Sequence, residues 1–197
     1  MKRTGMVVLV VLAIVVVVGL LVFGSYVSAR NQMVVKQEQV KQTWSQVEVV
    51  MQRRADLIPN LVATVQGFAQ HETTVFGDIA NARAALLGAH TPKDKIAANG
   101  QLDGALGRLL AISENYPQLR SNQNFLQLQD ELAGTENRIA VERRRYNEAV
   151  QDYNTFIGLF PNSIWANMAG FKRDNDYFTA TPAAAQPPKV DFSGMGK

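Results

Sequence analysis

The chain begins with a long apolar run, and two later segments repeat apolar residues in a regular rhythm. The run spans Met6 to Phe23, contains no charged residue, Asn or Gln, and follows Lys2 and Arg3. It is about as long as a helix that crosses the hydrocarbon core of a bilayer. A cleaved signal peptide is the alternative, because Val27-Ser28-Ala29 resembles a cleavage site. The run exceeds the roughly 7–15 residues of a signal core, so we favour an uncleaved transmembrane anchor.

Both later segments carry apolar residues at alternating spacings of three and four. A repeat of about 3.5 residues is the packing period of left-handed bundles and coiled coils. The pattern therefore predicts long helices around a shared core, and no segment alternates as a strand would. The first series is Val40, Trp44, Val47, Met51, Arg54, Ile58, Leu61, Val65 and Phe68, continued by Val75, Ile79, Ala82 and Leu86, and the second is Phe125, Leu128, Leu132, Thr135, Ile139, Glu142, Tyr146, Ala149, Tyr153, Phe156 and Phe160.

A shorter helix is predicted between the two series. Thr91 is a favourable N-cap, Pro92 fits the first helical position, and Asp94 adds an acid to the first turn. Turns are predicted on either side, at Gly88-Ala89-His90 and at Asn115-Tyr116-Pro117. The segment therefore connects the two long series as a separate helix.

Pro59 leaves the first series open to two interpretations. Proline inside a helix loses a hydrogen bond and clashes with the preceding turn, at a cost of about 3 kcal/mol. The apolar pattern keeps its phase across Pro59, which favours a kinked continuous helix. Alternatively, Asp56–Pro59 forms a tight turn and Pro59 opens a second helix. We lean towards the turn, which gives four long helices rather than three.

The resulting prediction is an all-α fold, with an N-terminal transmembrane helix followed by an elongated antiparallel bundle of three to four long helices. We divide the chain into an anchor (1–24), a bundle (25–178) and a flexible Ala/Pro-rich tail (179–197). Residues 25–36 contain neither Pro nor Gly, so the anchor can run directly into the first bundle helix as a rigid stalk. A short helical turn is expected at 162–170.

Charge and composition exclude several functional classes. Two of the 20 basic residues precede the apolar run, which leaves the remainder almost balanced against 17 acidic residues. Basic and acidic residues are also interleaved, whereas nucleic-acid binders concentrate basic residues on one face, so no nucleic-acid partner is expected. The absence of cysteine excludes disulfides, thiolate metal sites and cysteine nucleophiles.

Several short motifs follow one another along the bundle region. They are Trp44–Val47, RRADLIPNLV (Arg53–Val62), Glu114–Leu119, Asn122–Phe125, Glu136–Ala140, Tyr146-Asn147, Tyr153-Asn154, Phe160-Pro161 and Tyr177-Phe178. In these motifs and in their order the sequence resembles the LemA family of bacterial membrane-anchored proteins, from the anchor to about Phe178. The resemblance implies an N-terminal anchor and an antiparallel helical bundle. It implies little about activity, because the family's biochemical role is poorly defined.

Two charged residues, Arg54 and Glu142, fall inside otherwise apolar series. An isolated buried charge is very costly, so each needs a partner or must reach solvent. One hypothesis pairs Arg54 with Glu142 or Glu136 and so fixes helix register, in which case Glu142→Ala should lower the melting temperature sharply. The other lets both side chains snorkel out beside the series. Candidate structural or interaction residues in the same motif are Arg53, Asp56 and Pro59.

Tyr146-Asn147 and Tyr153-Asn154 are seven residues apart and therefore lie on one stripe of a helix. Tyr can bury its ring while its hydroxyl reaches a polar partner, and Asn can bond across helices. We favour ordinary bundle packing with a wet edge, and the alternative is a contact strip for another subunit. Tyr177-Phe178 adds an aromatic end to the bundle region. Gln-rich stretches elsewhere suit lateral helix contacts or plain solvent.

No set of residues has the pattern of a catalytic, cofactor or metal site. His71 and His90 lack a second ligand one helical turn away. The acidic pairs 130–131 and 174–176 have no nucleophile, histidine or glycine-rich loop beside them. We therefore expect no cofactor and regard an enzyme as the least favoured of three classes.

The leading functional hypothesis is a membrane-anchored structural or interaction protein that self-assembles, as a homo-oligomer, or scaffolds partners at the cell envelope. The alternative is an adaptor that binds one membrane partner, such as a protease or transporter, through a bundle face. A short tail carrying Lys2 and Arg3 prefers the cytoplasmic side. We therefore expect a single-pass protein of the bacterial inner membrane with its bundle on the extracytoplasmic side.

Overall fold

The computed structural model describes residues 2–179, and within them the chain forms helices and connecting segments without strands. The helices are α1 (Lys2–Gln66), α2 (Thr73–Gly88), α3 (Pro92–Ser113), α4 (Pro117–Arg120), α5 (Gln123–Gly158) and α6 (Asn162–Ala169). The prediction of an all-α fold is confirmed. The predicted tail lies outside the described residues, apart from Thr179.

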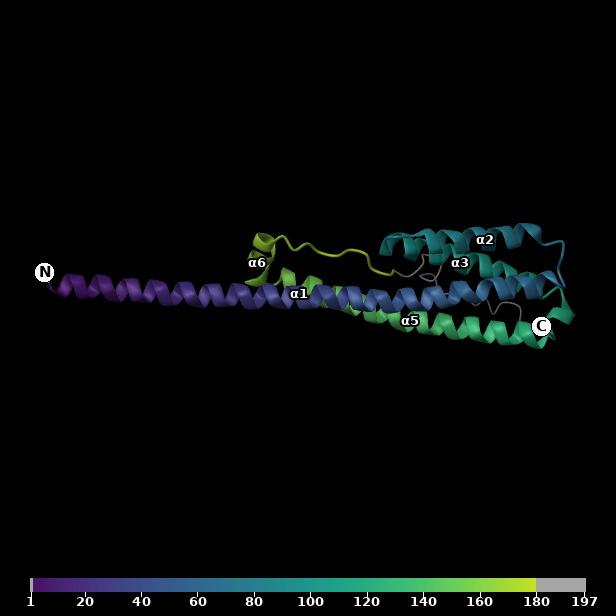
Figure 1. Cartoon of the computed structure of the whole chain (residues 1–197), viewed down its shortest axis with the longest axis horizontal. Helices are drawn as coiled ribbons and strands as arrows, with labels where there is room; N and C mark the ends of the chain where they lie inside the picture. Colours follow the sequence, from purple (N-terminus) through teal and green to yellow (C-terminus); the bar gives the residue numbers. More distant parts are fainter. Residues whose placement is uncertain (1, 180–197) are drawn as a thin grey trace, which may run out of the picture.

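The molecule is a rod built on α1, which runs along its whole length (Figure 1). α5 lies antiparallel beside the second half of α1, and the hairpin of α2 and α3 packs at the far end of the rod. α1 packs mainly against α5, whereas α2 packs mainly against α3. The short α6 lies near the middle of α1, and an extended segment returns from it towards the hairpin.

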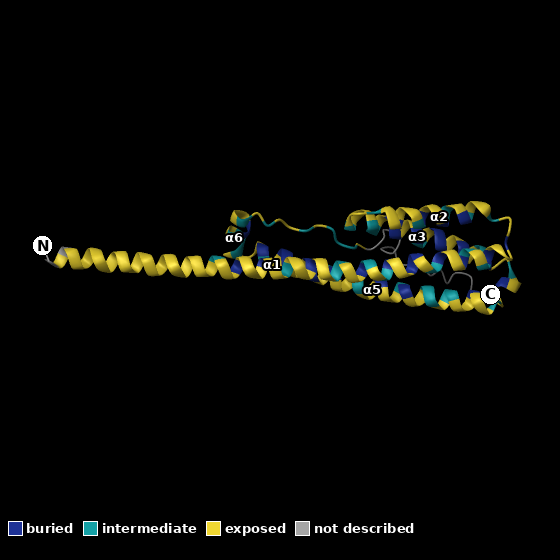
Figure 2. Cartoon of the chain, viewed as in Figure 1, coloured by how far each residue is buried: buried dark blue, intermediate teal, exposed yellow. Residues whose placement is uncertain are grey.

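The first part of α1 stands apart from the bundle. It contains one stretch that is long and apolar enough to cross a membrane, and none of that stretch is buried in the molecule. In Figure 2 the exposed N-terminal part contrasts with the buried positions that begin further along the helix. The first buried residue of α1 is Ala29, followed by Met33. The apolar run and the first bundle helix therefore form one continuous helix, as the missing Pro and Gly residues allow.

The two apolar series supply half of the buried apolar residues in the described part of the chain. From Val40 to Val65 the first series is buried on α1 except for Trp44, which is partly buried. Exceptions occur where a helix ends. Phe68 lies beyond the end of α1 and is 37% exposed, and Phe160 lies beyond the end of α5 and is 82% exposed. Because the chain leaves the helix, these two residues leave the buried face although the spacing continues.

The predicted turn at Pro59 is wrong, because α1 continues through it as a helix of 65 residues. Proline cannot donate the usual helical hydrogen bond to the carbonyl of the residue four positions earlier, which here is Ala55. Nε of Arg83, from α2, donates to that carbonyl over 2.8 Å. A neighbouring helix thus replaces the missing donor, and the buried Ile58 and Leu61 hold α1 in the bundle before and after Pro59.

The predicted start of the shorter helix and the two predicted turns are confirmed. Thr91 caps α3 by accepting from the backbone N–H of Asp94, and Pro92 occupies the first turn. Asn122 caps α5 in the same way through the N–H of Phe125. These caps satisfy backbone donors that a helix start leaves free, so the chain can reverse direction sharply.

Candidate interaction site

A charged cluster lies inside the bundle where α1, α3 and α5 meet. Arg54 of α1 is almost fully buried, and its Nη1 donates to Asp103 of α3. The same nitrogen donates to Oε2 of Glu136 of α5 over 2.7 Å. The two acidic side chains remain 36% and 42% exposed. One guanidinium therefore ties three helices together, while both of its counter-ions keep contact with water.

A second arginine and an amide extend this cluster. The buried Asn99 donates to Oδ2 of Asp103 over 3.1 Å, and Nη2 of Arg143 lies 3.9 Å from the same oxygen. The guanidinium carbon of Arg143 also lies 5.1 Å from the ring centroid of Phe178. Two arginines thus face two carboxylates, so the cluster is charge-balanced inside the bundle.

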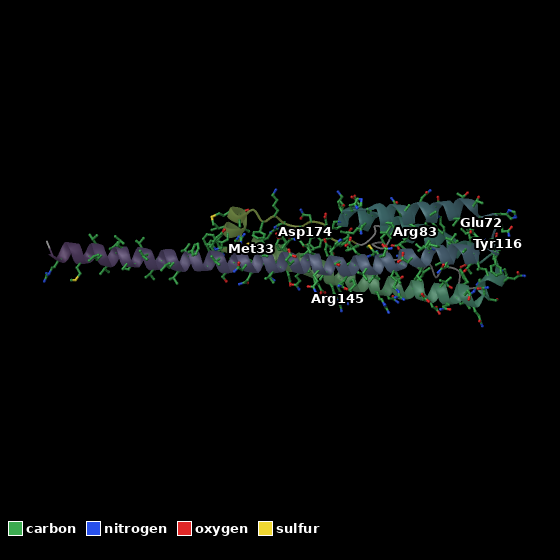
Figure 3. The ribbon with its side chains drawn as sticks, viewed as in Figure 1. Met33, Glu72, Arg83, Tyr116, Arg145 and Asp174 are labelled. Atoms are coloured by element: carbon green, nitrogen blue, oxygen red, sulfur yellow. The ribbon has the colours of Figure 1, made fainter. Side chains whose placement is uncertain are left out.

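Glu142 does not belong to the cluster. Its Oε1 accepts from Nη1 of Arg145, one turn further along α5, over 2.9 Å (Arg145 is labelled in Figure 3). The hypothesis of an Arg54–Glu142 pair is therefore wrong, and the observed contact is that of its alternative, Arg54 with Glu136. Residue 142 lies about 9 Å further along the helix axis than residue 136, which is too far for the same guanidinium.

The other candidates in the Arg54 motif face outwards. Arg53, Asp56 and Pro59 are exposed on α1. Oδ1 of Asp56 accepts from Nε2 of Gln52, one turn earlier, over 2.9 Å. Of the four candidates in the motif, Arg54 therefore lies in the core and the other three are available at the surface.

The Tyr–Asn stripe of α5 holds the extended segment that follows α6. The side-chain amide of Asn147 donates to the carbonyl of Phe178 over 2.8 Å and accepts from its N–H over 3.0 Å. Asn154 makes the same two contacts with the backbone of Asp174, at 2.6 and 2.9 Å, and also donates to the hydroxyl of Tyr177. Each amide thus pairs with the backbone N–H and C=O of one residue, as the backbone of a neighbouring strand would. The stripe considered for a second subunit is thus occupied by the chain itself.

Aromatic side chains fill the space between the segment and the bundle. Trp44 of α1 lies against Tyr146 of α5 and Phe178 of the segment, with ring centroids 5.2 and 6.0 Å apart. The hydroxyl of Tyr153 donates to the carbonyl of Lys172 over 2.8 Å. Burial, and then the negative charge of Asp174, raises the pKa of the Tyr146 and Tyr153 phenols. Both phenols therefore stay neutral well into the alkaline range.

Among residues 2–179, no three His, Cys, Asp or Glu side chains are grouped so that they could hold a metal ion. Both histidines, His71 and His90, are exposed. The charged side chains of the cluster are paired with one another, and the amides of the stripe bind backbone. This chemistry holds helices and a C-terminal segment together, and it leaves the outer helix faces as the surfaces for contact.

A sequence model of the LemA family matches residues 43–192. The chain belongs to the LemA family. The match covers the Arg54 motif, the cluster and the stripe, and it extends past the predicted bundle boundary at Phe178.

The chain is similar over most of its length to two magnetosome proteins and to a protein named LemA. Magnetosome protein MamQ 1 of Paramagnetospirillum magneticum is 31% identical over 183 residues, covering 80% of this chain and 67% of the relative. Magnetosome protein MamQ of Magnetospirillum gryphiswaldense is 30% identical over the same shares of the two chains. Protein LemA of Metamycoplasma hominis is 25% identical over 167 residues, covering 84% and 74%. None of these names specifies a reaction.

The sequence alone did not indicate three residues of the LemA-family core. Asp103 and Arg143 join the cluster, and Arg83 completes α1 at Pro59. One feature of the sequence could have indicated Asp103: it stands four residues after Asn99, beside the apolar stripe of the same helix, where the two polar side chains can meet. No feature of the sequence indicates the role of Arg83, because its acceptor is a backbone carbonyl, which every residue carries.

Proposed function

We propose that this LemA-family chain is a non-catalytic, membrane-anchored protein that self-assembles or scaffolds partners at the bacterial cell envelope. The observation that carries the proposal is the continuity of α1, whose apolar first part and bundle-forming second part belong to one helix of 65 residues. An unbroken helix joins the bundle rigidly to the apolar run that is proposed to cross the membrane. A chain built in this way presents a continuous helical surface that begins beside the bilayer.

The proposed location is the bacterial inner membrane, crossed once, with the bundle on the extracytoplasmic side. The short N-terminal tail carries Lys2 and Arg3, and basic tails of this kind stay in the cytoplasm. The charges of the bundle do not oppose this orientation, because large domains translocate largely regardless of charge.

An exposed strip on α1 supports self-assembly. Its members follow spacings of four and three in alternation, which is the period of a coiled-coil contact. All but Arg53, at one end, are uncharged, so the uncharged parts of two such strips can meet without burying like charges. The ends of the uncharged part, Val35 and Val49, are 66% and 61% exposed. The outer strip of α1 consists of the exposed residues Val35, Gln39, Gln42, Gln46, Val49 and Arg53.

The second candidate is an adaptor that binds one membrane partner, such as a protease or transporter, through a bundle face. A cleft of about 270 Å³ between α1, α3 and α5 favours it. An apolar cleft of this kind can accept a side chain of a partner. Its lining includes Leu61, Leu106, Leu110 and Leu132, together with Arg54 and Glu136 of the cluster.

Light scattering of the full-length chain in detergent micelles tests the leading proposal. We expect a defined multimer, which Gln42→Glu together with Val49→Glu converts to a monomer because both changes place charge in the contact. The control Gln151→Glu places one negative charge on an exposed position of α5, outside the strip, and leaves the mass of the multimer unchanged.

A monomeric parent chain would contradict self-assembly and favour the adaptor, whose partner should then co-purify from the membrane. Turnover of a substrate by the purified chain alone would contradict the non-catalytic proposal.

A further inference from the structure

An exposed apolar patch lies on α6 and in the turn just before it. The α6 patch consists of Leu159, Phe160, Ile164 and Met168, which are 58%, 82%, 52% and 63% exposed. Ile164 and Met168 are four residues apart, so they share one face of the short helix. The chain from residue 159 to residue 171 contains no charged side chain. Adjacent exposed apolar residues without charge indicate a surface that something apolar covers.

α6 lies beside α1 at the level where the apolar run ends. The ring of Trp165 meets the ring of Tyr26 edge-on, with centroids 5.6 Å apart, and α6 packs against α1. Tyr26 follows Phe23, the last residue of the apolar run, by only about 4.5 Å along the helix axis. Figure 1 shows that α6 stands across α1 rather than along it, near the place where the bundle gives way to the bare part of α1.

This position matches the boundary between the headgroups and acyl chains of a bilayer. Trp and Tyr are enriched at that depth, because their rings are apolar and their polar atoms reach water. A helix that lies in the membrane plane buries its apolar face about 5–10 Å into the same boundary. Arg30, Lys172 and Arg173 follow the run and α6 as exposed basic residues, and such residues attract anionic headgroups.

We propose that the α6 patch is a second membrane contact, seated in the headgroup–acyl boundary of the phospholipid bilayer that α1 crosses. The proposal rests on α1 crossing a membrane, as proposed above. The bilayer is the occupant because the patch adjoins the transmembrane run at the depth where lipid begins. A single helix leaves the rod free to turn about its axis and to tilt. A second contact restricts both motions and so fixes the direction in which the outer strip of α1 faces.

Spin labels on single cysteines test this contact in the full-length chain, which has no cysteine of its own. Ile164→Cys and Met168→Cys report on the patch, and the second position keeps the test valid if one variant does not fold. Asn175→Cys is the exposed control in the segment after α6. Val15→Cys reports separately on the transmembrane run. Each chain is reconstituted into vesicles of phosphatidylethanolamine and phosphatidylglycerol, and the collision rates of the label with oxygen and with a water-soluble nickel chelate are compared.

We expect the labels at positions 164 and 168 to collide several-fold more often with oxygen than with the chelate, and the label at position 175 to show the reverse. If position 164 meets the chelate as readily as position 175 while position 15 remains in lipid, the α6 contact is overturned and the anchor stands. If the label at position 15 collides mainly with the chelate, both the transmembrane anchor and the α6 contact are overturned. Spin–spin broadening at position 168 that disappears on dilution with unlabelled chain assigns the patch to a second copy and overturns the bilayer contact.

Discussion

At the scale of single residues, the charge of Arg54 decides how the bundle core is held. Its guanidinium lies between Asp103 and Glu136, so the loss of both negative charges leaves a buried cation without a counter-ion. We predict that Asp103→Asn combined with Glu136→Gln lowers the free energy of unfolding by about 3–5 kcal/mol. Chemical denaturation of the full-length chain in micelles, followed by circular dichroism, measures the change.

Glu142→Gln is the matched control for this prediction. It removes an acidic charge from the same helix, but the partner of Glu142 is Arg145, whose side chain is 61% exposed, while that of Glu142 is 16% exposed. Its cost should be smaller, about 1 kcal/mol, because the cation left without a partner, Arg145, lies in solvent rather than inside the bundle. A loss as large as that of the double variant would contradict a special role for the Arg54 cluster.

The buried phenol of Tyr146 makes the free energy of unfolding depend on pH in the alkaline range. Burial raises the pKa of Tyr146 above its ordinary value of 10.0. Above that pH the unfolded chain loses a proton that the folded chain keeps, so the free energy of unfolding falls as the pH rises. We predict that Tyr146→Phe makes this fall shallower by up to about 1.4 kcal/mol per pH unit. Denaturation curves at several pH values from about 9 to 12 measure both slopes, and equal slopes contradict the prediction.

The sequence could single out Arg54 but could not choose its partners. A charge inside an apolar series is conspicuous because a lone buried charge is so costly. Glu136 and Glu142 stand six residues apart on one helix, and the position and rotation of α5 against α1 decide between them. Asp103 comes from another helix, whose docking depends on the whole core rather than on local spacing.

At the scale of elements, the continuity of α1 at Pro59 depends on α2. Arg83 donates to the carbonyl of Ala55, a buried residue that Pro59 deprives of its helical donor. We predict that Arg83→Met lowers the free energy of unfolding by about 1–3 kcal/mol, the cost of an unsatisfied buried carbonyl. Chemical denaturation measures the loss, and methionine keeps most of the apolar contact of the arginine stem.

The Pro59→Ala background tests whether that loss arises at the carbonyl. Alanine restores a backbone N–H that can bond to Ala55, so Arg83→Met should then cost at least about 1 kcal/mol less. Equal costs in the two backgrounds would show that Arg83 stabilises the bundle through other contacts.

The apolar series predicted the helices well because their period is a property of packed helices themselves. Helix ends were less visible. Phe160 continues the rhythm of the second series, yet α5 ends at Gly158 and the ring is exposed. The segment after α6 was not foreseen on the Tyr–Asn stripe, because Asn147 and Asn154 bind backbone groups that any sequence would offer.

At the scale of the whole molecule, α1 determines how far the bundle reaches from the membrane. From Ser25 to Gln66 the helix extends about 60 Å at 1.5 Å per residue. The bundle is laid along this stretch rather than stacked at its end (Figure 1). The outer strip therefore begins close to the proposed membrane surface and continues away from it, so chains anchored side by side can contact one another along the strip.

The proposed orientation predicts which parts of the molecule a membrane-impermeant reagent can reach from outside the cell. With a single cysteine at Asn175, on the exposed segment after α6, a charged maleimide should label intact spheroplasts as fully as permeabilised ones. Gly5→Cys is the control at the N-terminal end of α1, where an added side chain meets nothing within 4 Å. Its label should appear only after permeabilisation, because the basic tail holds this end in the cytoplasm. The opposite pattern would place the bundle in the cytoplasm. The fold and the α6 contact would be unaffected, since both depend on the end of the apolar run and not on which side of the membrane it faces.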